Sequence, residues 1–193
     1  MPALDQPTLR TERLVLRPLR EADASALFGI FSDTKVMRYW STPPWTTMDQ
    51  AHAMIARDLK AMPAGEHLLL GIERAGDGAL LGTCTLFSIN ATCRRAEVGY
   101  GLASAAWGQG YMDEALRSLL AYGFSELNLN RVEADIDPRN HASGRALERL
   151  GFAREGLLRE RWIVDGEVSD TALYGLLRRV WMDSLMAGKE KAL

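Results

Sequence analysis

The chain has 193 residues, of which 25% are charged and 47% are hydrophobic, and its formal net charge is −2. This length and composition exclude a disordered or fibrous chain and fit a single globular domain with one substantial core. Because positive and negative charges nearly balance, the sequence gives no polyelectrolyte signal, and nucleic acid is not an expected partner. Cys84 and Cys93 are too few for a disulfide framework, and no Cys/His set has zinc-ligand spacing. We therefore expect two reduced thiols and no metal.

The sequence also gives no targeting signal. No charged-then-apolar leader opens it, and its longest apolar runs are too short to span a bilayer. We therefore expect a cytoplasmic protein without a membrane partner.

The first half of the chain predicts a strand, two helices and a meander of strands. A short strand at 14–16 is followed by helical spacing of apolar residues over 27–31. The segment 39–45 holds two prolines and two tryptophans, so it is predicted to be a loop. Apolar residues then mark one face of a helix. The predicted elements that follow are a helix over 51–62 and strands at 67–73, 79–89 and 96–102.

The second half alternates helices and strands and closes with a hairpin. The predicted elements are a helix over 112–127, a strand at 131–136, a helix over 142–150 ended by Gly151, and paired strands at 152–164 and 167–177. The order β-α-α-β-β-β-α-β-α-β-β predicts a mixed-sheet α/β fold. We expect one domain over 8–182, with tails at 1–7 and 183–193.

The loop between the strand at 96–102 and the next helix is the most informative stretch. Gly108 and Gly110 stand in it, and an amphipathic helix begins directly afterwards. Glycines let the backbone approach a ligand closely, and a helix N-terminus offers unpaired N–H groups at the positive end of the macrodipole. The combination predicts an anion cradle, most often one for phosphate, with the carboxylate of Glu97 nearby.

Several phosphate sites share such a loop. A Walker-type loop is excluded because no Gly-Lys-Ser/Thr tripeptide occurs. A dinucleotide fold is disfavoured, although Asp135 lies near the position of a ribose-binding acid, because Asp113 occupies the third glycine position. A purely structural tight turn, in which the glycines only allow the helix to pack on the sheet, also stays open.

Ordered segments along nearly the whole chain, from about residue 8 to 181, resemble the GNAT acetyltransferase superfamily, in its RimJ/RimL-type branch. The matching segments are Glu97-Val-Gly-Tyr-Gly-Leu102, Trp107-Gly-Gln-Gly-Tyr-Met-Asp-Glu-Ala-Leu116, Asn130-Arg-Val-Glu-Ala134, Asp137-Pro-Arg-Asn140, Ser143, Leu147-Glu-Arg-Leu-Gly-Phe152 and Glu155-Gly156. The resemblance implies the GNAT fold, which is a mostly antiparallel central sheet with one splayed parallel pair and flanking helices. It also implies acetyl-CoA as the co-substrate.

In this family the main chain of the glycine loop holds the pyrophosphate, and the pantetheine arm inserts between the splayed strands, here 96–102 and 131–136. The resemblance therefore implies cofactor contacts from Val98, Tyr100, Leu102, Trp107, Gly108, Gln109, Gly110, Tyr111, Met112, Asn140 and Ser143. Trp107 replaces the usual Arg or Gln, and Met112 replaces a small residue. Neither change affects main-chain donors. Asn140 is equally suited to cap the next helix.

Acetyl transfer to an amine requires that the ammonium group lose a proton. Glu97 is the candidate base because it directly precedes the cofactor strand, and the alternative is an ion pair with Arg94 or Arg95. The resemblance implies that Ser143 donates a proton to the departing thiolate, and the alternative is a helix-start hydroxyl that bonds the backbone.

Trp40 and Trp45 are candidates for a substrate wall, because the family places substrate-selecting segments in this region. A small satellite core under the loop is the alternative. The resemblance favours transfer of acetyl from acetyl-CoA to a protein N-terminal α-amine. A small polyamine or an aminoglycoside-like amine is the alternative acceptor, and a non-catalytic acyl-CoA sensor is the alternative function. We expect a monomer or a homodimer.

Overall fold

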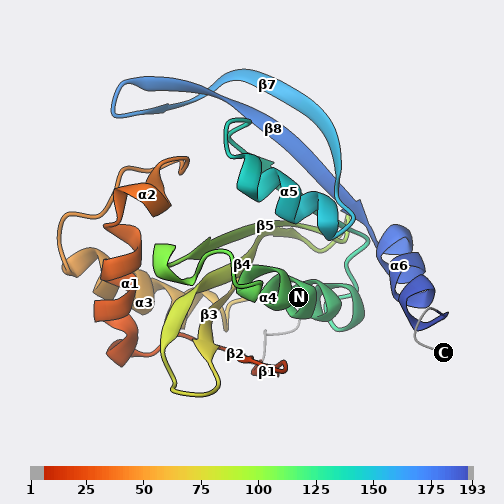
Figure 1. The fold of residues 1–193 in the computed structure, drawn as a ribbon, viewed down its shortest axis with the longest axis horizontal. Helices are drawn as coiled ribbons and strands as arrows, with labels where there is room; N and C mark the ends of the chain where they lie inside the picture. Colours follow the sequence, from red (N-terminus) through yellow and green to blue (C-terminus); the bar gives the residue numbers. More distant parts are fainter. Residues whose placement is uncertain (1–6, 191–193) are drawn as a thin grey trace.

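The structure is a computed structural model that describes residues 7–190. One mixed sheet holds eight strands in the order β1-β2-β3-β4-β5-β6-β8-β7 (Figure 1). The strands are β1 (Leu9–Arg10), β2 (Leu14–Arg17), β3 (Leu68–Arg74), β4 (Leu80–Asn90), β5 (Arg95–Leu102), β6 (Arg131–Ile136), β7 (Ala153–Val164) and β8 (Glu167–Leu177). The helices are α1 (Ala24–Phe31), α2 (Thr34–Met37), α3 (Asp49–Ala61), α4 (Tyr111–Ser125), α5 (His141–Arg149) and α6 (Arg178–Glu190).

The sheet is antiparallel except where β5 meets β6. These two strands run parallel and pair at only three positions, which end with Glu97 opposite Glu133. Beyond that point β5 continues to Leu102 beside β4 alone, while β6 continues to Ile136 beside β8. The expected antiparallel sheet with one splayed parallel pair is therefore confirmed.

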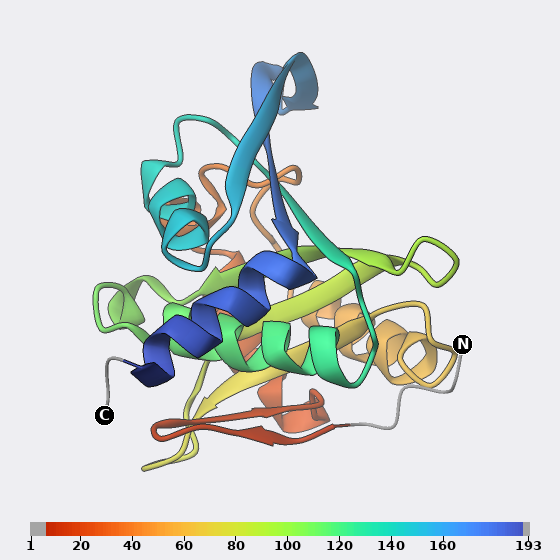
Figure 2. The same cartoon turned by 90° about the vertical axis from the view of Figure 1, so that its right-hand side faces the viewer.

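Two hydrophobic clusters cover the two faces of the sheet. The larger one contains the buried side of α4, and Phe124 of that helix stacks on Trp181 of α6 with 5.9 Å between ring centroids. Figure 2 shows α4 and α6 lying across the same face. The smaller cluster joins α1, α2 and α3, with Leu27 and Ile55 fully buried. Burial of each such side chain contributes about 1.5–3 kcal/mol.

Helix α4 follows from its sequence pattern. Leu116, Leu119, Leu120 and Phe124 recur on one face and are at most 1% exposed. Gly110, at φ 80°, starts the helix, and Asn128, at φ 50°, turns the chain after it. The helix therefore ends at Ser125, slightly before the predicted boundary.

One strand and two α-helices were not predicted from the sequence. β1 has two residues and α2 has four, which is too short for a periodicity signal. The third is α6, which occupies residues where a tail was expected from 183 onward. Its anchor, Trp181, is 2% exposed only because α4 lies beside it. The other parts of the expected tails, 1–6 and 191–193, lie outside the described residues.

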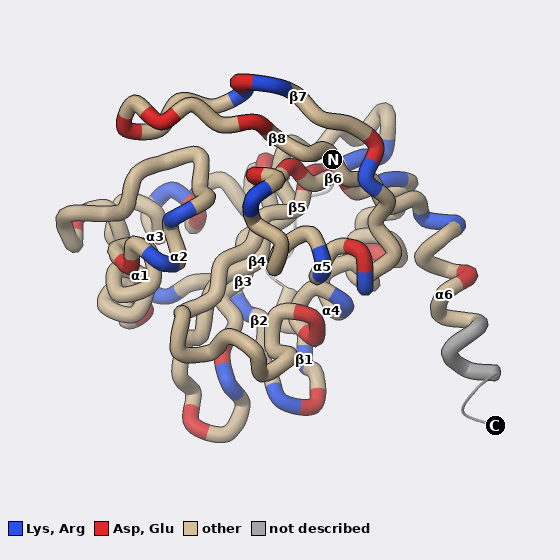
Figure 3. Tube along the Cα trace, turned by 45° about the horizontal axis from the view of Figure 1, so that its top comes forward, with Lys and Arg blue, Asp and Glu red and all other residues tan. Residues whose placement is uncertain are grey.

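The β7–β8 hairpin forms a long arm that reaches over α5 toward α2 (Figure 1). Charges of both signs are scattered along the chain, and acidic residues mark the turn of this arm (Figure 3). Among residues 7–190, no helix is long and apolar enough to cross a membrane. Both cysteines are free, with Cys84 buried and Cys93 exposed.

Candidate active site

A cavity of about 1000 Å³ lies between the sheet, the 39–45 loop and the β7–β8 arm. Strand register explains its floor. Gly99 follows Glu97 by two residues on β5, so it lies on the same face of the sheet as Glu97. Thr85 of β4 pairs with Gly99 and lies on that face too. Asp135 lies on that face too, because it follows Glu133, the partner of Glu97, by two residues. Thr85, Gly99 and Asp135 all line the cavity.

The cavity also reaches the opening between β5 and β6. Tyr100 and Ile136 belong to the opposite face of these strands, yet both line the cavity together with Asn140 and Ser143. Residues from both faces of the sheet line one cavity because β5 and β6 separate beyond Glu97 and Glu133 and leave a passage between them. A reactant can therefore enter the opening from one face while a second reactant approaches from the other.

The glycine loop has the conformation that an anion cradle needs. Gly108 and Gly110 have φ values of 74° and 80°, in the left-handed region that glycine favours. In the described part of the chain, no acceptor pairs with the backbone N–H groups of residues 108–110. The first turn of α4 adds the unpaired N–H groups of a helix start. These donors fit a pyrophosphate.

Arg13, which the sequence analysis missed, ties the N-terminal strands to this loop. Its Nη1 donates to the Gln109 carbonyl at 3.0 Å, and its Nε donates to Glu114 Oε2 at 2.7 Å. Its guanidinium also lies 4.7 Å from the Tyr111 ring centre. Burial alone would raise the pKa of Glu114, but hydrogen bonds from Thr11 and Arg13 lower it. No sequence pattern links residue 13 to a loop 96 positions away.

The remaining residues expected around the loop take different positions. Trp107 turns its ring back, and its Nε1 donates to the Leu102 carbonyl at 2.8 Å. Tyr111 and Met112 pack partly against the larger core. Val98 lines the cavity, whereas Leu102 and residues 107–112 do not.

The start of α5 brings Asn140 and Ser143 to the cavity. Asn140 caps the helix, since its Oδ1 accepts from the Ser143 N–H at 3.1 Å. The Ser143 hydroxyl lies 2.7 Å from the Tyr100 hydroxyl. Burial raises the pKa of Tyr100 to about 12, so its hydroxyl stays neutral. The capping alternative for Asn140 is therefore present, and a ligand contact from the same residue stays a prediction.

Trp40 and Trp45 form the satellite core that was the alternative, and their role as a substrate wall stays a prediction. Each packs on Phe31, with ring centroids 5.2 Å and 4.8 Å apart. Both also line the cavity. A Cβ placed on Gly101 would lie 2.8 Å from the Trp40 ring, so only glycine allows this approach of the loop to β5. The satellite core thus holds the aromatic wall in place.

Glu97 lies outside the cavity. It sits where β5 and β6 are still paired and does not line the cavity. It forms no ion pair with Arg94, Arg95 or any other described residue, so the ion-pair alternative is absent. Asp135, two residues beyond the partner of Glu97 on β6, does line the cavity. The sequence analysis did not include it among the candidate residues for acyl transfer. Its signal in the sequence was the pair of acids two residues apart, Glu133 and Asp135, on one face of the strand.

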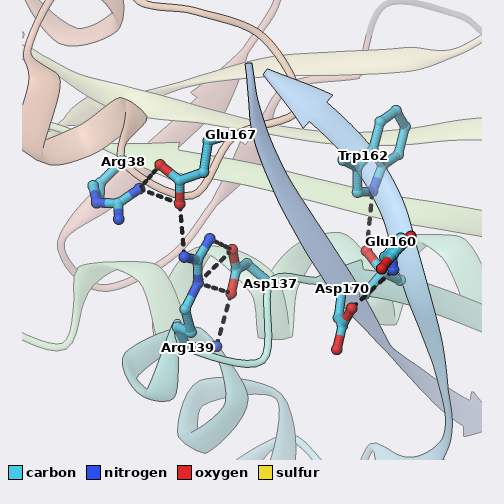
Figure 4. A network of polar contacts seen from close by, with 8 residues as sticks. Arg38, Asp137, Arg139, Glu160, Trp162, Glu167 and Asp170 are labelled. Carbon is cyan, nitrogen blue, oxygen red and sulfur yellow. Dashed lines mark hydrogen bonds and ion pairs between the residues drawn. The ribbon is translucent and has the colours of Figure 1, made fainter. Parts of the chain in front are cut away.

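Four charged residues that line the cavity form one network of polar contacts (Figure 4): Arg38, Asp137, Arg139 and Glu167. Glu167, at the start of β8, accepts from Arg139 Nη1 at 2.6 Å and from Arg38 Nη1 at 3.1 Å. Arg139 also binds Asp137. This network joins the tip of the β7–β8 arm to α2 and to the loop after β6. Burial alone would raise the pKa of Asp137, but hydrogen bonds from Arg139 lower it.

Comparison with known proteins identifies this combination of fold and loop. The model of the acetyltransferase (GNAT) domain family matches residues 13–153. The uncharacterized N-acetyltransferase p20 of Bacillus licheniformis is 37% identical over 174 residues, covering 89% of this chain and 97% of that protein. The ribosomal protein uS5 alanine N-acetyltransferase of Escherichia coli is 25% identical over 181 residues, covering 90% of this chain and 92% of that protein.

A solved structure with the same fold is that of spermidine N-acetyltransferase from Vibrio cholerae in complex with CoA and spermine. Its TM-score is 0.79 at 23% identity, covering 89% of this chain and 99% of that chain, and the likeness shows the fold. The site and these relatives define an N-acetyltransferase. The chain belongs to the GNAT family, and its relatives include enzymes of the ribosomal-protein type. The expected family and enzyme class are confirmed.

Proposed function

We propose that the protein transfers acetyl from acetyl-CoA to the α-amine at the N-terminus of a peptide or protein. The observation that carries the proposal is the cavity that opens through the splayed β5–β6 pair. Its acceptor side is wide and lined by Trp40, Trp45 and Trp162, which suits a peptide end better than a small compact ligand. The activity of the Escherichia coli relative on ribosomal protein uS5 supports the same acceptor class.

The residues present fit acetyl-CoA. The unpaired N–H groups of residues 108–112 would hold its pyrophosphate, and the free edge of β5 beyond Glu97 would pair with its pantetheine arm. Asn140 and Ser143 stand beside that edge at the start of α5. When bound, acetyl-CoA supplies the activated acetyl group. The chain orients the acceptor amine, removes its proton and supports the departing sulfur.

Ser143 is the candidate proton donor for that sulfur. Its hydroxyl is held by the neutral hydroxyl of Tyr100, so one of the two can donate outward while the other accepts. Glu97, which the sequence predicts as the base, does not line the cavity.

A small polyamine is the second candidate acceptor. The observation that favours it is Asp135, a carboxylate that faces the cavity among aromatic rings, a setting that suits an ammonium group. The fold shared with the spermidine acetyltransferase agrees with this possibility and does not select it.

Turnover on a mixed panel tests the proposal. The purified protein, acetyl-CoA and a thiol reagent are combined with peptides that have free N-termini, with N-terminally blocked copies and with spermidine. We expect CoA release only with free peptide N-termini, and a product one acetyl group heavier by mass spectrometry. Release with spermidine alone would replace the peptide by the polyamine, and release with no amine would overturn both.

A further inference from the structure

We propose that Asp135 is the residue that accepts the proton of the acceptor ammonium, in place of Glu97. The proposal rests on the N-acetyltransferase function and holds for either acceptor class. Asp135 lies on the face of β6 that also carries Glu133, two residues beyond Glu133, where the pairing of β5 and β6 ends.

Three acids lie on this face of the two strands, and their surroundings differ. Glu97 lies outside the cavity. Glu133 is neutralised, because it accepts from Arg95 Nη1 and from Arg131 Nε, both at 2.7 Å. Asp135 is half-buried and lines the cavity, and its carboxylate forms no hydrogen bond or ion pair with any residue between 7 and 190. Of the three, only Asp135 has a carboxylate that is free to meet a ligand there.

The space in front of Asp135 is open because its neighbour across the gap is glycine. Gly99 follows Glu97 just as Asp135 follows Glu133, so the two would be opposite each other if the strands had stayed paired. A Cβ at Gly99 would already lie 3.2 Å from Thr85 and 3.3 Å from the Phe87 ring. A larger residue at 99 would crowd these β4 side chains, and glycine adds no side chain of its own to the opening between β5 and β6.

The surroundings of Asp135 raise the pKa of its carboxylate, and no neighbouring charge that the structure describes forms an ion pair with it. Burial raises its pKa, and Arg161 on β7 opposes this from a distance. Four other charged groups face the cavity, and they pair with one another. Asp137 and Arg139 come from the loop after β6, Arg38 from the end of α2, and Glu167 from the start of β8. Arg57 on α3 lines the far wall. A carboxylate with a raised pKa is a stronger proton acceptor near neutral pH.

In the proposed transfer, each proton and each electron pair has a definite destination. The ammonium proton passes to the Asp135 carboxylate, which becomes a neutral acid. The freed lone pair of the nitrogen forms the C–N bond to the acetyl carbon, and the C–S bond breaks with its electron pair on sulfur. The attacked nitrogen then loses its second surplus proton, and the sulfur gains one proton through the Ser143–Tyr100 pair or solvent, so that this pair is left unchanged. Asp135 returns its own proton to solvent, which is the one proton that the whole reaction releases.

Matched amide variants test the assignment on whichever amine the wild-type protein acetylates. Asp135→Asn is compared with Glu97→Gln, since each removes one carboxylate from the same sheet face. We expect kcat to fall about 100-fold or more in Asp135→Asn, with an unchanged KM for acetyl-CoA. Glu97→Gln should stay within about threefold of wild type, a change of less than 1 kcal/mol.

The pH profile separates a proton acceptor from a structural residue. The loss of kcat in Asp135→Asn, relative to the wild type, should become smaller toward about pH 9, where a free α-amine is already unprotonated. Asp135→Glu, which keeps the carboxylate, should recover part of the rate. A deficit independent of pH, or a large loss in Glu97→Gln with an active Asp135→Asn, would overturn the assignment. A wild-type protein that acetylates no amine would overturn the proposed function, and this assignment with it.

Discussion

The two sides of the proposed site differ in the atoms that they offer to a ligand. The donor side, residues 98–102 and 108–112, offers backbone N–H and C=O groups from one continuous stretch of chain. The acceptor side, the 39–45 loop, Asp135 and the β7–β8 arm, offers side chains from segments far apart in sequence. Main-chain recognition needs only a backbone shape, whereas side-chain recognition needs several segments to be held together.

A change in the backbone shape of the donor side should have one of the two largest effects among the tests of this comparison. Gly108→Ala places a Cβ at φ 74°, which costs about 1–2 kcal/mol in the left-handed region. We expect the KM for acetyl-CoA to rise about tenfold, because the loop leaves its anion-binding shape to relieve the strain. Initial rates at varied acetyl-CoA measure it.

Gly76→Ala is the control, since its Cβ also meets nothing within 4 Å but its φ lies outside the left-handed region. An equal rise in both variants would show that the conformation of the loop is not what binds the donor.

The second test separates the two sides by their tryptophans. Trp40→Ala removes a ring from the acceptor wall, and Trp107→Ala removes one from the donor loop. We expect Trp40→Ala to raise the acceptor KM about tenfold and to leave the KM for acetyl-CoA unchanged. Trp107→Ala should raise the KM for acetyl-CoA by a smaller factor and leave the acceptor KM unchanged, because we propose that the main chain of this loop binds the donor.

Steady-state kinetics with each substrate varied in turn gives both constants. Thermal unfolding of Trp40→Ala accompanies them, because loss of its packing on Phe31 also lowers stability. If both KM values moved together in either variant, the division into two sides would fail.

A smaller effect is expected at Ser143, where the two sides meet. Ser143→Ala removes the hydroxyl that pairs with Tyr100. We expect kcat to fall about fivefold, below the usual range for acid catalysis, because a thiolate is already a good leaving group. Single-turnover acetylation measures it. Ser125→Ala, whose hydroxyl bonds only a backbone carbonyl of α4, should behave as wild type.

The smallest effect is expected where the acceptor arm is tied down. Glu167→Gln weakens the contacts to Arg38 and Arg139, which are all exposed and therefore weak in water. We expect the acceptor KM to rise about twofold, and high salt to mimic this in the wild type. The pKa of Glu167 is lowered by Arg139 and Arg38, so the tether holds at neutral pH and loosens only as pH falls through that lowered value.

Asp77→Asn is the control for the tether. It removes an equally exposed ion pair with Arg74, on the β3–β4 turn and outside the cavity. An acceptor KM that changes equally in both variants would show that the arm does not help to form the acceptor side.

Local patterns determined most of the fold and the donor side. The apolar repeat of α4, the C′ glycine at Gly151 and the alternation of the strands each lie within one segment, where period and turn chemistry act. The loop at 108–112 could be predicted for the same reason, since glycines before a helix start carry their chemistry locally.

Only the tertiary structure decided the acceptor side and the supports of the loop. Arg13 reaches Gln109 because β2 lies beneath the start of α4, and α6 is held in place by stacking on that helix. Glu97 and Asp135 cannot be ranked from sequence, because what separates them is where two strands stop pairing. The sequence by itself determined the class of enzyme and its donor loop. Register and splay, which depend on contacts between distant strands, decided which carboxylate lines the cavity.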